Sequence, residues 1–363
     1  MEKETTVILR DLTTGYRIKK NNKVISSNLN AQLHAGELTC MLGPNGAGKS
    51  TLLRTLAAFQ PALSGEIIID NVSLQKYSPR DLSKQVSVVL TNNSNIRNMT
   101  AEEVVAIGRS PYTGFWGRLR ERDRKTIEKC MEWVEIGHLR HRQMQTLSDG
   151  ERQKVMIAKA IAQETPIILL DEPTAFLDYP SKVSTMLMLH RLAKALKKTI
   201  FMSTHDLEHA LQVADQIWLI DKENGLTSGI PEDLCAEGQI ERYFLRPGLT
   251  FERTTCSFGI EHEVAREVLF EGNPDHLDYQ LAARAFIRNA IRPIRHMQEA
   301  QFEGTRADVV IRIPGDGTYR VIDKGEEAIC ANRIEHIISI TNSTLIKNQI
   351  QSVREAANMT AFE

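Results

Sequence analysis

The sequence predicts an α/β fold, in which a parallel sheet is layered with helices, and two stretches of the chain support this. Leu38–Leu42 is a continuous apolar strand that leads into a glycine-rich turn, and residues 49–58 carry apolar positions at helical spacing. Strand, turn and helix in this order form the unit of a parallel sheet, whose buried strands are apolar throughout. Strand-like and helix-like segments alternate again between Ile167 and Asp221, as layered α/β folds require.

The composition is that of a folded globular chain. The 363 residues include 45 Lys plus Arg and 46 Asp plus Glu, a formal charge of -1, and 42% of them are hydrophobic. A nearly neutral chain does not bind nucleic acid by bulk charge, and this apolar content argues against disorder. We therefore expect roughly two domains and no nucleic-acid partner.

Membrane, targeting and disulfide signals are weak. The longest aliphatic run, Ile167–Leu170, falls far short of the roughly 18 to 20 apolar residues of a membrane helix. Met1–Thr6 lacks the charged and apolar regions of a signal segment, so the cytoplasm is the predicted location. The five cysteines form no Cys-x-x-Cys pair and are expected to be buried, reduced thiols. They are Cys40, Cys130, Cys235, Cys256 and Cys330.

The first predicted domain covers residues 1–250. It opens with short strands at Val7–Leu9 and Ser27–Leu33, and the span Ala101–Gln163 reads as mainly helical, a subdomain over about 95–165 that interrupts the sheet. The other strand and helix candidates are Gly65–Asp70, Lys182–Leu196, Thr199–Ser203, Leu207–Ala214 and Gln216–Asp221.

Residues 251–363 are expected to form a small α+β accessory domain. A helix is predicted at Leu277–Ile291, with an apolar face at Leu281, Ala285 and Ile291 beside basic Arg284, Arg288 and Arg292. Strands are predicted at Val309–Ile313 and Tyr319–Ile322, and two more helices at Ile334–Ile340 and Leu345–Ala357.

A phosphate-binding loop is the strongest motif. The pattern G-x-x-x-x-G-K-[ST] lies between the apolar strand and the helical pattern, the context that distinguishes it from a chance glycine-rich turn. Its backbone N–H groups and the helix N-terminus attract phosphates, Lys49 reaches the outer phosphates and Ser50 suits Mg²⁺. The candidate nucleotide-binding residues here are Gly43, Pro44, Asn45, Gly46, Ala47, Gly48, Lys49, Ser50 and Thr51.

Two carboxylates end the buried strand Ile167–Leu170. Asp171 suits Mg²⁺, and Glu172, which points elsewhere, is suited to take a proton from an attacking water. Two solvated acids at a strand end are the alternative, which the phosphate loop disfavours.

Leu147–Gln153 opens a helix, and Ser148 and Glu151 have the spacing of a capping box. The phosphate loop, this segment and Asp171-Glu172, in this order, resemble the ATP-binding cassette (ABC) ATPases. The resemblance implies a P-loop NTPase fold over residues 1–250, with a RecA-like core, an antiparallel β subdomain and a helical signature subdomain. In that family Ser148 and Gly150 face the γ-phosphate of an ATP held by the other subunit of a homodimer. Capping and phosphate binding are compatible, since both use the free N–H groups of a helix start.

Three further positions fit the family. Tyr16 matches the aromatic residue that stacks on adenine, Asp178 lies in the segment that communicates between the two nucleotide sites, and His205 matches the histidine that contacts the γ-phosphate. A surface tyrosine and a structural histidine are the alternatives outside this context. The resemblance implies an ATPase that uses ATP and Mg²⁺.

Met99–Tyr112, followed by Gly117-Arg118-Leu119, is similar to the importers of ferric siderophores, haem and cobalamin, where Asp149 in place of the usual glycine is also found. Helical packing before a proline-terminated turn explains the segment equally well. The importer resemblance implies separate integral-membrane permease subunits, a substrate-binding protein, and a place on the inner face of the cell membrane. The rival is a soluble ABC-type ATPase, such as one in iron-sulfur cluster assembly.

One position departs from the family. Aligning Val86–Leu90 with the family puts Thr91 where a glutamine usually senses Mg²⁺ and the membrane partner. A threonine hydroxyl reaches a metal through water but lacks the amide. Asn92 in that role, or a register shifted by one residue, remains open.

The accessory domain is longer than the short family form. Metal sensing is one reading, and a dimer-stabilising or permease-contacting module built on the helix at Leu277–Ile291 is the one favoured here. The conceivable metal ligands are Cys256, Cys330, His262, His276, His296 and His336.

Overall fold

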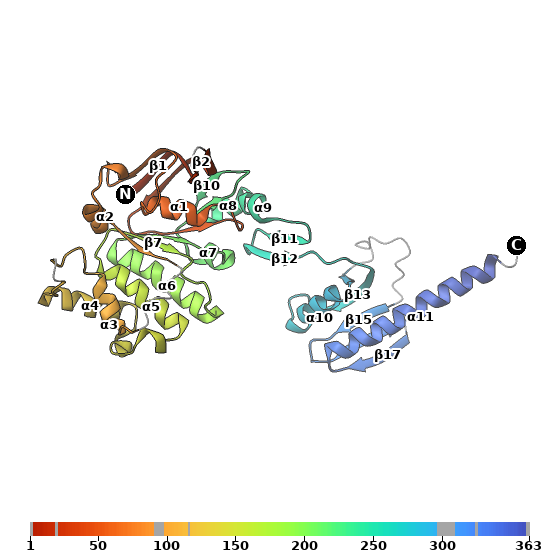
Figure 1. Ribbon diagram of the computed structural model, residues 1–363. Coiled ribbons are helices and arrows are strands. Elements are labelled where there is room, and N and C mark those ends of the chain that lie inside the picture. Colours follow the sequence, from red (N-terminus) through yellow and green to blue (C-terminus); the bar gives the residue numbers. More distant parts are fainter. Residues whose placement is uncertain are drawn as a thin grey trace. The chain divides into compact units, whose positions relative to one another are not determined.

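The computed structural model describes residues 3–18, 21–90, 98–114, 117–295, 309–323 and 326–360. The chain divides into two compact units (Figure 1). Unit 1 comprises residues 1–247 with 251–259, and unit 2 comprises 248–250 with 260–363. Within the described residues, no helix is both long and apolar enough to cross a membrane.

A six-stranded sheet forms the centre of unit 1, in the order β10-β9-β3-β8-β7-β6. All neighbours pair in parallel except β10 with β9. Alternate residues of β7 belong to different cores: Ile167 and Leu169 pack towards α1, while Ile168 and Leu170 pack towards the helical subdomain. Burial on both faces explains why this strand is apolar throughout. The strands are β3 Leu38–Leu42, β6 Val86–Val89, β7 Ile167–Asp171, β8 Thr199–Ser203, β9 Gln216–Ile220 and β10 Leu226–Gly229.

Helices and a second sheet cover the central sheet. The helices are α1 Lys49–Leu56, α2 Pro79–Gln85, α6 Tyr179–Leu196, α7 Leu207–Val213, α8 Pro231–Ala236 and α9 Gln239–Phe244. The second sheet is antiparallel, in the order β2-β1-β4-β5. Its strands are β1 Thr5–Ile18, β2 Asn21–His34, β4 Ser64–Ile69 and β5 Val72–Ser73.

The two strands that open the chain are longer than predicted, at 14 residues each. Asp11 and Asn28 have positive φ angles of 45° and 55°, and the pairing register of the two strands shifts near them. The Asn30 side chain donates to the Asp11 carboxylate at 2.9 Å. Polar residues that read as strand breaks are therefore accommodated in bulges.

The helical subdomain consists of α3 (Ala101–Ile107), α4 (Glu121–Trp133) and α5 (Asp149–Ala162), as the sequence predicts. Short 3₁₀ turns lie at Leu74–Lys76, Gly137–Leu139 and Met144–Thr146.

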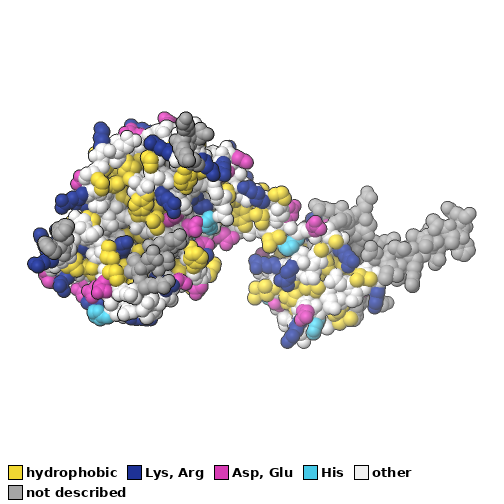
Figure 2. All heavy atoms as spheres, in the orientation of Figure 1, with side chains coloured by type: hydrophobic (Ala, Val, Ile, Leu, Met, Phe, Trp, Pro, Cys, Tyr) yellow, Lys and Arg dark blue, Asp and Glu magenta, His cyan; other side chains and the backbone are white. Residues whose placement is uncertain are grey.

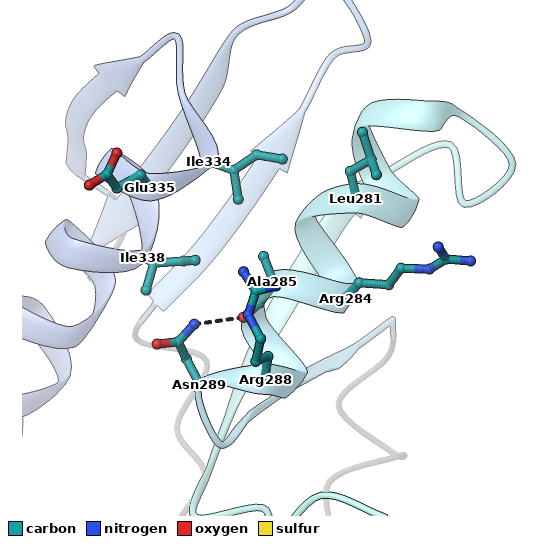
Figure 3. A pocket seen from close by; sticks show the side chains of 8 residues that line it. All are labelled: Leu281, Arg284, Ala285, Arg288, Asn289, Ile334, Glu335 and Ile338. Atoms are coloured by element: carbon teal, nitrogen blue, oxygen red, sulfur yellow. Dashed lines mark hydrogen bonds between the residues drawn. The ribbon is translucent and has the colours of Figure 1, made fainter. Parts of the chain in front are cut away.

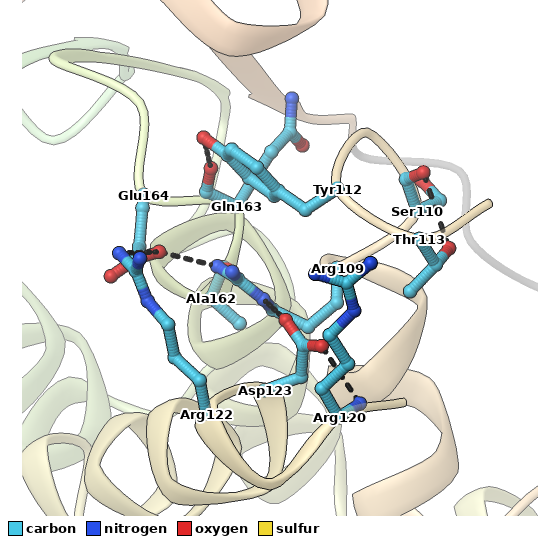
Figure 4. A network of polar contacts seen from close by, with 10 residues as sticks. All are labelled: Arg109, Ser110, Tyr112, Thr113, Arg120, Arg122, Asp123, Ala162, Gln163 and Glu164. Atoms are coloured by element: carbon cyan, nitrogen blue, oxygen red, sulfur yellow. Dashed lines mark hydrogen bonds and ion pairs between the residues drawn. The ribbon is translucent and has the colours of Figure 1, made fainter. Parts of the chain in front are cut away.

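A buried arginine ties the subdomain together (Figure 4). Arg109, only 2% exposed, donates from Nε to Asp123 at 2.9 Å and from Nη1 to Glu164 and to the Ala162 carbonyl, both at 2.7 Å. Its guanidinium also lies 4.3 Å from the centre of the Tyr112 ring. The connection between α3 and α4 is thereby fixed to the start of α4 and the end of α5.

Unit 2 is a five-stranded sheet in the order β14-β13-β15-β16-β17, with its own core. Its helices are α10 Leu277–Arg288 and α11 Ile334–Thr360. Its strands are β13 Arg266–Gly272, β14 Ile291–Ile294, β15 Val309–Ile313, β16 Tyr319–Asp323 and β17 Glu326–Ala331. A hairpin of β11 (Leu249–Glu252) and β12 (Ser257–Ile260) precedes them.

Three predictions for this unit are wrong. Ile291 is not helical: α10 ends at Arg288, and Ile291 opens β14, buried beside β13. The buried face of α10 is Tyr279, Ala282, Ala285 and Phe286, whereas Leu281 is 42% exposed.

The two helices predicted at 334–340 and 345–357 are one, α11. The polar run Thr341–Thr344 suggested a break. Thr341 is instead buried, and the Ser343 hydroxyl donates to the Ser339 carbonyl one turn earlier at 2.9 Å. This back-bonding satisfies the hydroxyl without ending the helix.

A groove of about 530 Å³ lies between α10 and α11 (Figure 3). Leu281 and Ile338 line it, together with Arg288 from α10 and Glu335 from α11. On the face of the molecule shown in Figure 2, Lys, Arg, Asp and Glu side chains are interspersed, in keeping with the net charge of -1.

The cysteine prediction is wrong for two of the five residues. Cys40, Cys130 and Cys235 are buried, but Cys256 is half-buried and Cys330 is exposed. Burial raises the pKa of the Cys130 thiol to about 12.

Candidate functional site

The phosphate loop connects β3 to α1, and three of its residues must be glycine. A Cβ at position 43 would lie 2.1 Å from the Ile220 carbonyl oxygen. Gly46 and Gly48 have φ angles of 77° and 102°, and a Cβ on Gly48 would lie 2.7 Å from Ile25. Side chains are excluded at these points by steric contact or by backbone conformation, so the loop presents main chain.

Lys49, the first residue of α1, is buried and turned back over the loop. Its ammonium donates to the carbonyl oxygens of Gly43 at 2.6 Å and Pro44 at 3.2 Å. Burial lowers the pKa of Lys49, although Glu172 and Asp171 partly oppose that shift. A desolvated ammonium held at the loop is suited to a phosphate, whose charge favours the protonated form.

Asp171 and Ser50 meet at the end of β7. Asp171 Oδ1 accepts from the Ser50 hydroxyl at 3.1 Å and from the Ser203 hydroxyl at 2.8 Å. Ser203 lies opposite Asp171 in the pairing of β7 with β8, and it also accepts the Glu172 N–H at 3.0 Å. The sequence analysis placed Ser203 only at the end of a predicted strand and assigned it no role at the site. Its contact with Asp171 depends on the strand order, which local patterns do not show.

Glu172 and His205 form the second polar pair. Glu172 Oε1 lies 2.5 Å from His205 Nε2, and His205 Nδ1 lies 3.5 Å from the Lys49 ammonium. These partners assign the ring proton to Nε2, which donates to Glu172, while Nδ1 accepts from Lys49. Glu172 has φ 49°, a left-handed conformation that is uncommon for a residue with a side chain and that occurs at functional sites.

Tyr16 on β1 is 42% exposed, and its hydroxyl lies 3.2 Å from the Thr51 hydroxyl. The ring is therefore attached to the helix that begins in the phosphate loop. An exposed aromatic face at this place is suited to stacking on a base.

The segment around Ser148 caps α5. Ser148 accepts the Glu151 N–H at 3.2 Å, and Glu151 accepts the Ser148 N–H at 2.8 Å, the reciprocal pair of a capping box. Hydrogen bonds from Ser148 hold the pKa of Glu151 below its usual range. The other N–H groups of this helix start remain available for an anion.

Gly150 has a different environment from the loop glycines. A Cβ there would lie 3.8 Å from its nearest neighbours, Leu177 and Ser181, an ordinary contact distance. Glycine within a helix costs about 1 kcal/mol relative to alanine. The packing of the chain does not require glycine at this position.

Asp178 caps α6 by accepting the Ser181 N–H at 3.1 Å. Hydrogen bonding from the Ser181 side chain, together with this main-chain bond, lowers the pKa of Asp178. Two residues earlier, Phe176 has φ 64° and is 84% exposed. An exposed aromatic side chain held in this conformation suits contact with another molecule.

The structure brings most of the predicted residues together. Lys49, Ser50, Asp171, Glu172 and His205 are joined by direct contacts at the ends of β3, β7 and β8. Among the contacts of the described residues, none joins Ser148 or Gly150 to this group.

Two sets of candidates have another outcome. Thr91 and Asn92 lie outside the described residues. Within the described part of the chain, no three His, Cys, Asp or Glu side chains are grouped to hold a metal ion. His276 instead caps α10 by accepting the Asp278 N–H, and His296 is not among the described residues.

Comparisons with known proteins identify the family. Residues 26–175 match the family model described as ABC transporter. An ABC transporter ATP-binding protein of Methanocaldococcus jannaschii is 42% identical over 224 residues, which cover 62% of this chain and 76% of the relative. The ferric enterobactin transport ATP-binding protein FepC of Escherichia coli is 32% identical over 233 residues, covering 64% and 84% of the two chains.

A solved structure gives the same result for the fold. The ATP-binding cassette MJ0796, as a dimer in a post-hydrolysis state with ADP and phosphate, is 27% identical with a TM-score of 0.53. The match covers 61% of this chain and 97% of the cassette. The fold of this chain over the matched region is therefore that of an ATP-binding cassette. This chain belongs to the ABC transporter ATP-binding proteins and is an ATPase of the P-loop α/β class.

Proposed function

We propose that this chain is the ATP-hydrolysing subunit of an importer for a ferric siderophore, haem or cobalamin. The observation that carries the ATPase mechanism is the contact of Lys49, His205 and Glu172 at the mouth of the phosphate loop. The substrate class is supported by the names of relatives, among them the ferric enterobactin and iron(3+)-hydroxamate import proteins.

We infer that each nucleotide site is shared between two copies of the chain. The phosphate loop of one copy holds ATP, with Tyr16 against the adenine, and the α5 start of the other copy, Ser148 to Gly150, contacts the γ-phosphate. Gly150 supports this, since its missing side chain serves no packing within its own chain and allows a close approach by a ligand. Asp178, close to exposed Phe176, is assigned to communication between the two sites.

Mg²⁺ fits the oxygen donors at the end of β7. Ser50 Oγ and Asp171 Oδ1 lie 3.1 Å apart, and hydroxyl and carboxylate oxygens are the ligands this ion prefers. These residues would hold the ion, directly or through water, and the bound ion would neutralise charge on the phosphates. Thr91 is the third candidate for this ion.

Each of three residues of this chain then carries out a different part of the hydrolysis. Lys49 neutralises the outer phosphates, and Glu172 accepts a proton from the attacking water as the water oxygen bonds to the γ-phosphorus. The bond from that phosphorus to the bridging oxygen breaks, which yields ADP and phosphate. His205, hydrogen-bonded to Glu172 in the free chain, turns to the γ-phosphate and holds it in line.

The partners follow from this assignment. Closure and reopening of the two copies would move integral-membrane permease subunits docked near residues 91–112, with a substrate-binding protein delivering the cargo. The chain would then sit in the cytoplasm, peripheral on the inner face of the cell membrane. Residues 260–363, which belong to unit 2, would form the accessory domain, and the predicted start at residue 251 is corrected because residues 251–259 belong to unit 1.

The test compares the wild type with Glu172→Gln, using Glu208→Gln, an exposed acid, as the control. Loss of a general base lowers turnover by about 10² to 10⁴-fold. Glu172→Gln should therefore hydrolyse ATP more slowly than the wild type by this factor. It should also remain an ATP-bound dimer by light scattering. A monomeric Glu172→Gln chain with ATP would refute the shared site, and unchanged turnover would refute Glu172 as the general base.

The importer assignment is tested with the permease subunits in vesicles. ATP turnover should rise when a capture protein loaded with ferric siderophore, haem or cobalamin is supplied on the opposite side. Turnover that responds to none of these cargoes would overturn the substrate class and leave the ATPase mechanism standing.

A further inference from the structure

Two cysteines far apart in the sequence meet in unit 1. Cys235 lies on α8, and Cys256 lies in the turn of the β11–β12 hairpin. Their sulfurs are 2.9 Å apart. Two sulfur atoms that do not attract each other stay farther apart than this. Cys235 is buried, while Cys256 is half-buried and reachable from solvent.

The hairpin turn is held against α8 and α9 by other contacts. Arg253 donates to Glu241 on α9 at 2.5 Å and to the Ala236 carbonyl at the end of α8. The Phe251 and Phe258 rings lie 4.9 Å apart between centres in a tilted contact, and both pack against the core of unit 1. The two sulfurs therefore face each other in an arrangement that is fixed independently of them.

The chemistry of the pair favours a covalent bond over a metal. A thiolate metal site needs three or four ligands, and the described residues supply no third His, Cys, Asp or Glu to this pair. A disulfide needs two sulfurs about 2.05 Å apart, less than 1 Å from the present separation.

We propose that Cys235 and Cys256 form a reversible disulfide that locks the hairpin turn to α8. The oxidant is a low-molecular-weight disulfide such as oxidised glutathione. The Cys256 thiolate attacks one of its sulfurs and releases one glutathione thiolate. Cys235, on losing its proton, attacks Cys256 Sγ and releases the second. Two protein thiols are oxidised and one glutathione disulfide is reduced to two thiols.

Burial raises the pKa of Cys235 to about 12, and the hydrogen bond with Cys256 adds to the shift. Cys256 therefore begins the exchange and Cys235 completes it. Where thiols are kept reduced, as in the cytosol, the disulfides that do form are usually transient and catalytic or redox-sensing.

The test uses the full chain carrying Cys330→Ser, which removes the exposed cysteine of unit 2. The chain is equilibrated with reduced and oxidised glutathione in graded ratios, quenched with an alkylating agent and digested with trypsin. The oxidised chain should escape alkylation at two cysteines and yield a cross-link of residues 223–242 with 254–266. The reductant dithiothreitol should reverse both changes.

Matched variants keep the outcome decisive. Adding Cys256→Ser should leave Cys235 as a thiol and abolish the cross-link, whereas Cys130→Ser should keep it. Glutathione that stays attached to Cys256, cross-links between two chains, or free thiols at every ratio would each overturn the proposal. None of these measurements depends on ATP turnover or on the proposed transport role.

Discussion

Single residues at the nucleotide site serve either the fold or the ligand. The loop glycines serve the fold, since a Cβ at Gly43 would strike the main chain of Ile220. At Gly150 a Cβ would meet only ordinary contacts, so the packing does not require glycine there. Glu172 has a positive φ, and its carboxylate lies 2.5 Å from His205 Nε2.

The substitution Gly150→Ala tests whether this glycine serves the stability of the chain or the binding of ATP between two copies. Since the new methyl meets only ordinary contacts, we expect the free energy of unfolding to stay equal or rise by up to about 1 kcal/mol. ATP-driven dimerisation, measured by light scattering in the Glu172→Gln background, should be lost. Gly137→Ala, where the new methyl would lie in open space, is the control that should leave the dimer intact. A destabilised Gly150→Ala chain would show that the glycine is needed for folding.

At the scale of elements, polar side chains fix helices to each other and to their own ends. Arg109 satisfies three acceptors from two helices and the loop after α5. Ser148 and Glu151 satisfy the start of α5. The sequence predicted the second arrangement, because its partners are three residues apart. It did not predict the first, whose partners are 14, 53 and 55 residues apart.

The variant Arg109→Met should destabilise unit 1 by about 3 to 5 kcal/mol, because it leaves the Asp123 carboxylate buried without its cationic partner. Asp123 is 5% exposed. Denaturant unfolding followed by circular dichroism measures this loss. Arg122→Met, whose side chain is 82% exposed and 3.9 Å from Glu164, should change stability by no more than about 1 kcal/mol. Equal effects of the two substitutions would contradict the role assigned to Arg109.

The Glu151 carboxylate, which caps α5, makes the stability of the folded chain depend on pH. The pKa of Glu151 in the folded chain is below its usual value, mainly because it accepts the Ser148 N–H. Its contribution to stability is therefore fully present above the unfolded pKa of about 4.3 and is lost as the pH falls through the folded pKa. Glu151→Gln keeps the capping geometry, so its stability deficit should be constant at neutral pH and vanish in acid. A deficit that persists at the lowest pH would point to packing instead of charge.

At the scale of the whole molecule, the two units have separate cores, and the hairpin of β11 and β12 contributes to the core of unit 1. Phe251, Cys256 and Phe258 pack against that core, although they lie after the point near residue 250 where the sequence suggested the boundary.

Two truncations test where unit 1 ends. A chain that stops after His262 keeps these three side chains and should retain ATP hydrolysis and the thermal unfolding of unit 1. A chain that stops after Pro247 exposes the apolar surface they cover, so its unfolding temperature should fall. Calorimetry of both, beside the full chain, measures the difference. Identical unfolding of the two truncations would show that the hairpin adds nothing to unit 1.

The sequence by itself determined the ATPase class and the loop, the cap and the acids that carry it, because each of these motifs is a short contiguous stretch whose residue types and spacing are visible in the sequence. Only the tertiary structure decided that Ser203 supports Asp171, that α11 runs unbroken past Thr341, and that Cys256 meets Cys235. These contacts depend on which strands are neighbours and which helix faces are buried. That information belongs to the path of the whole chain, and local residue patterns do not contain it.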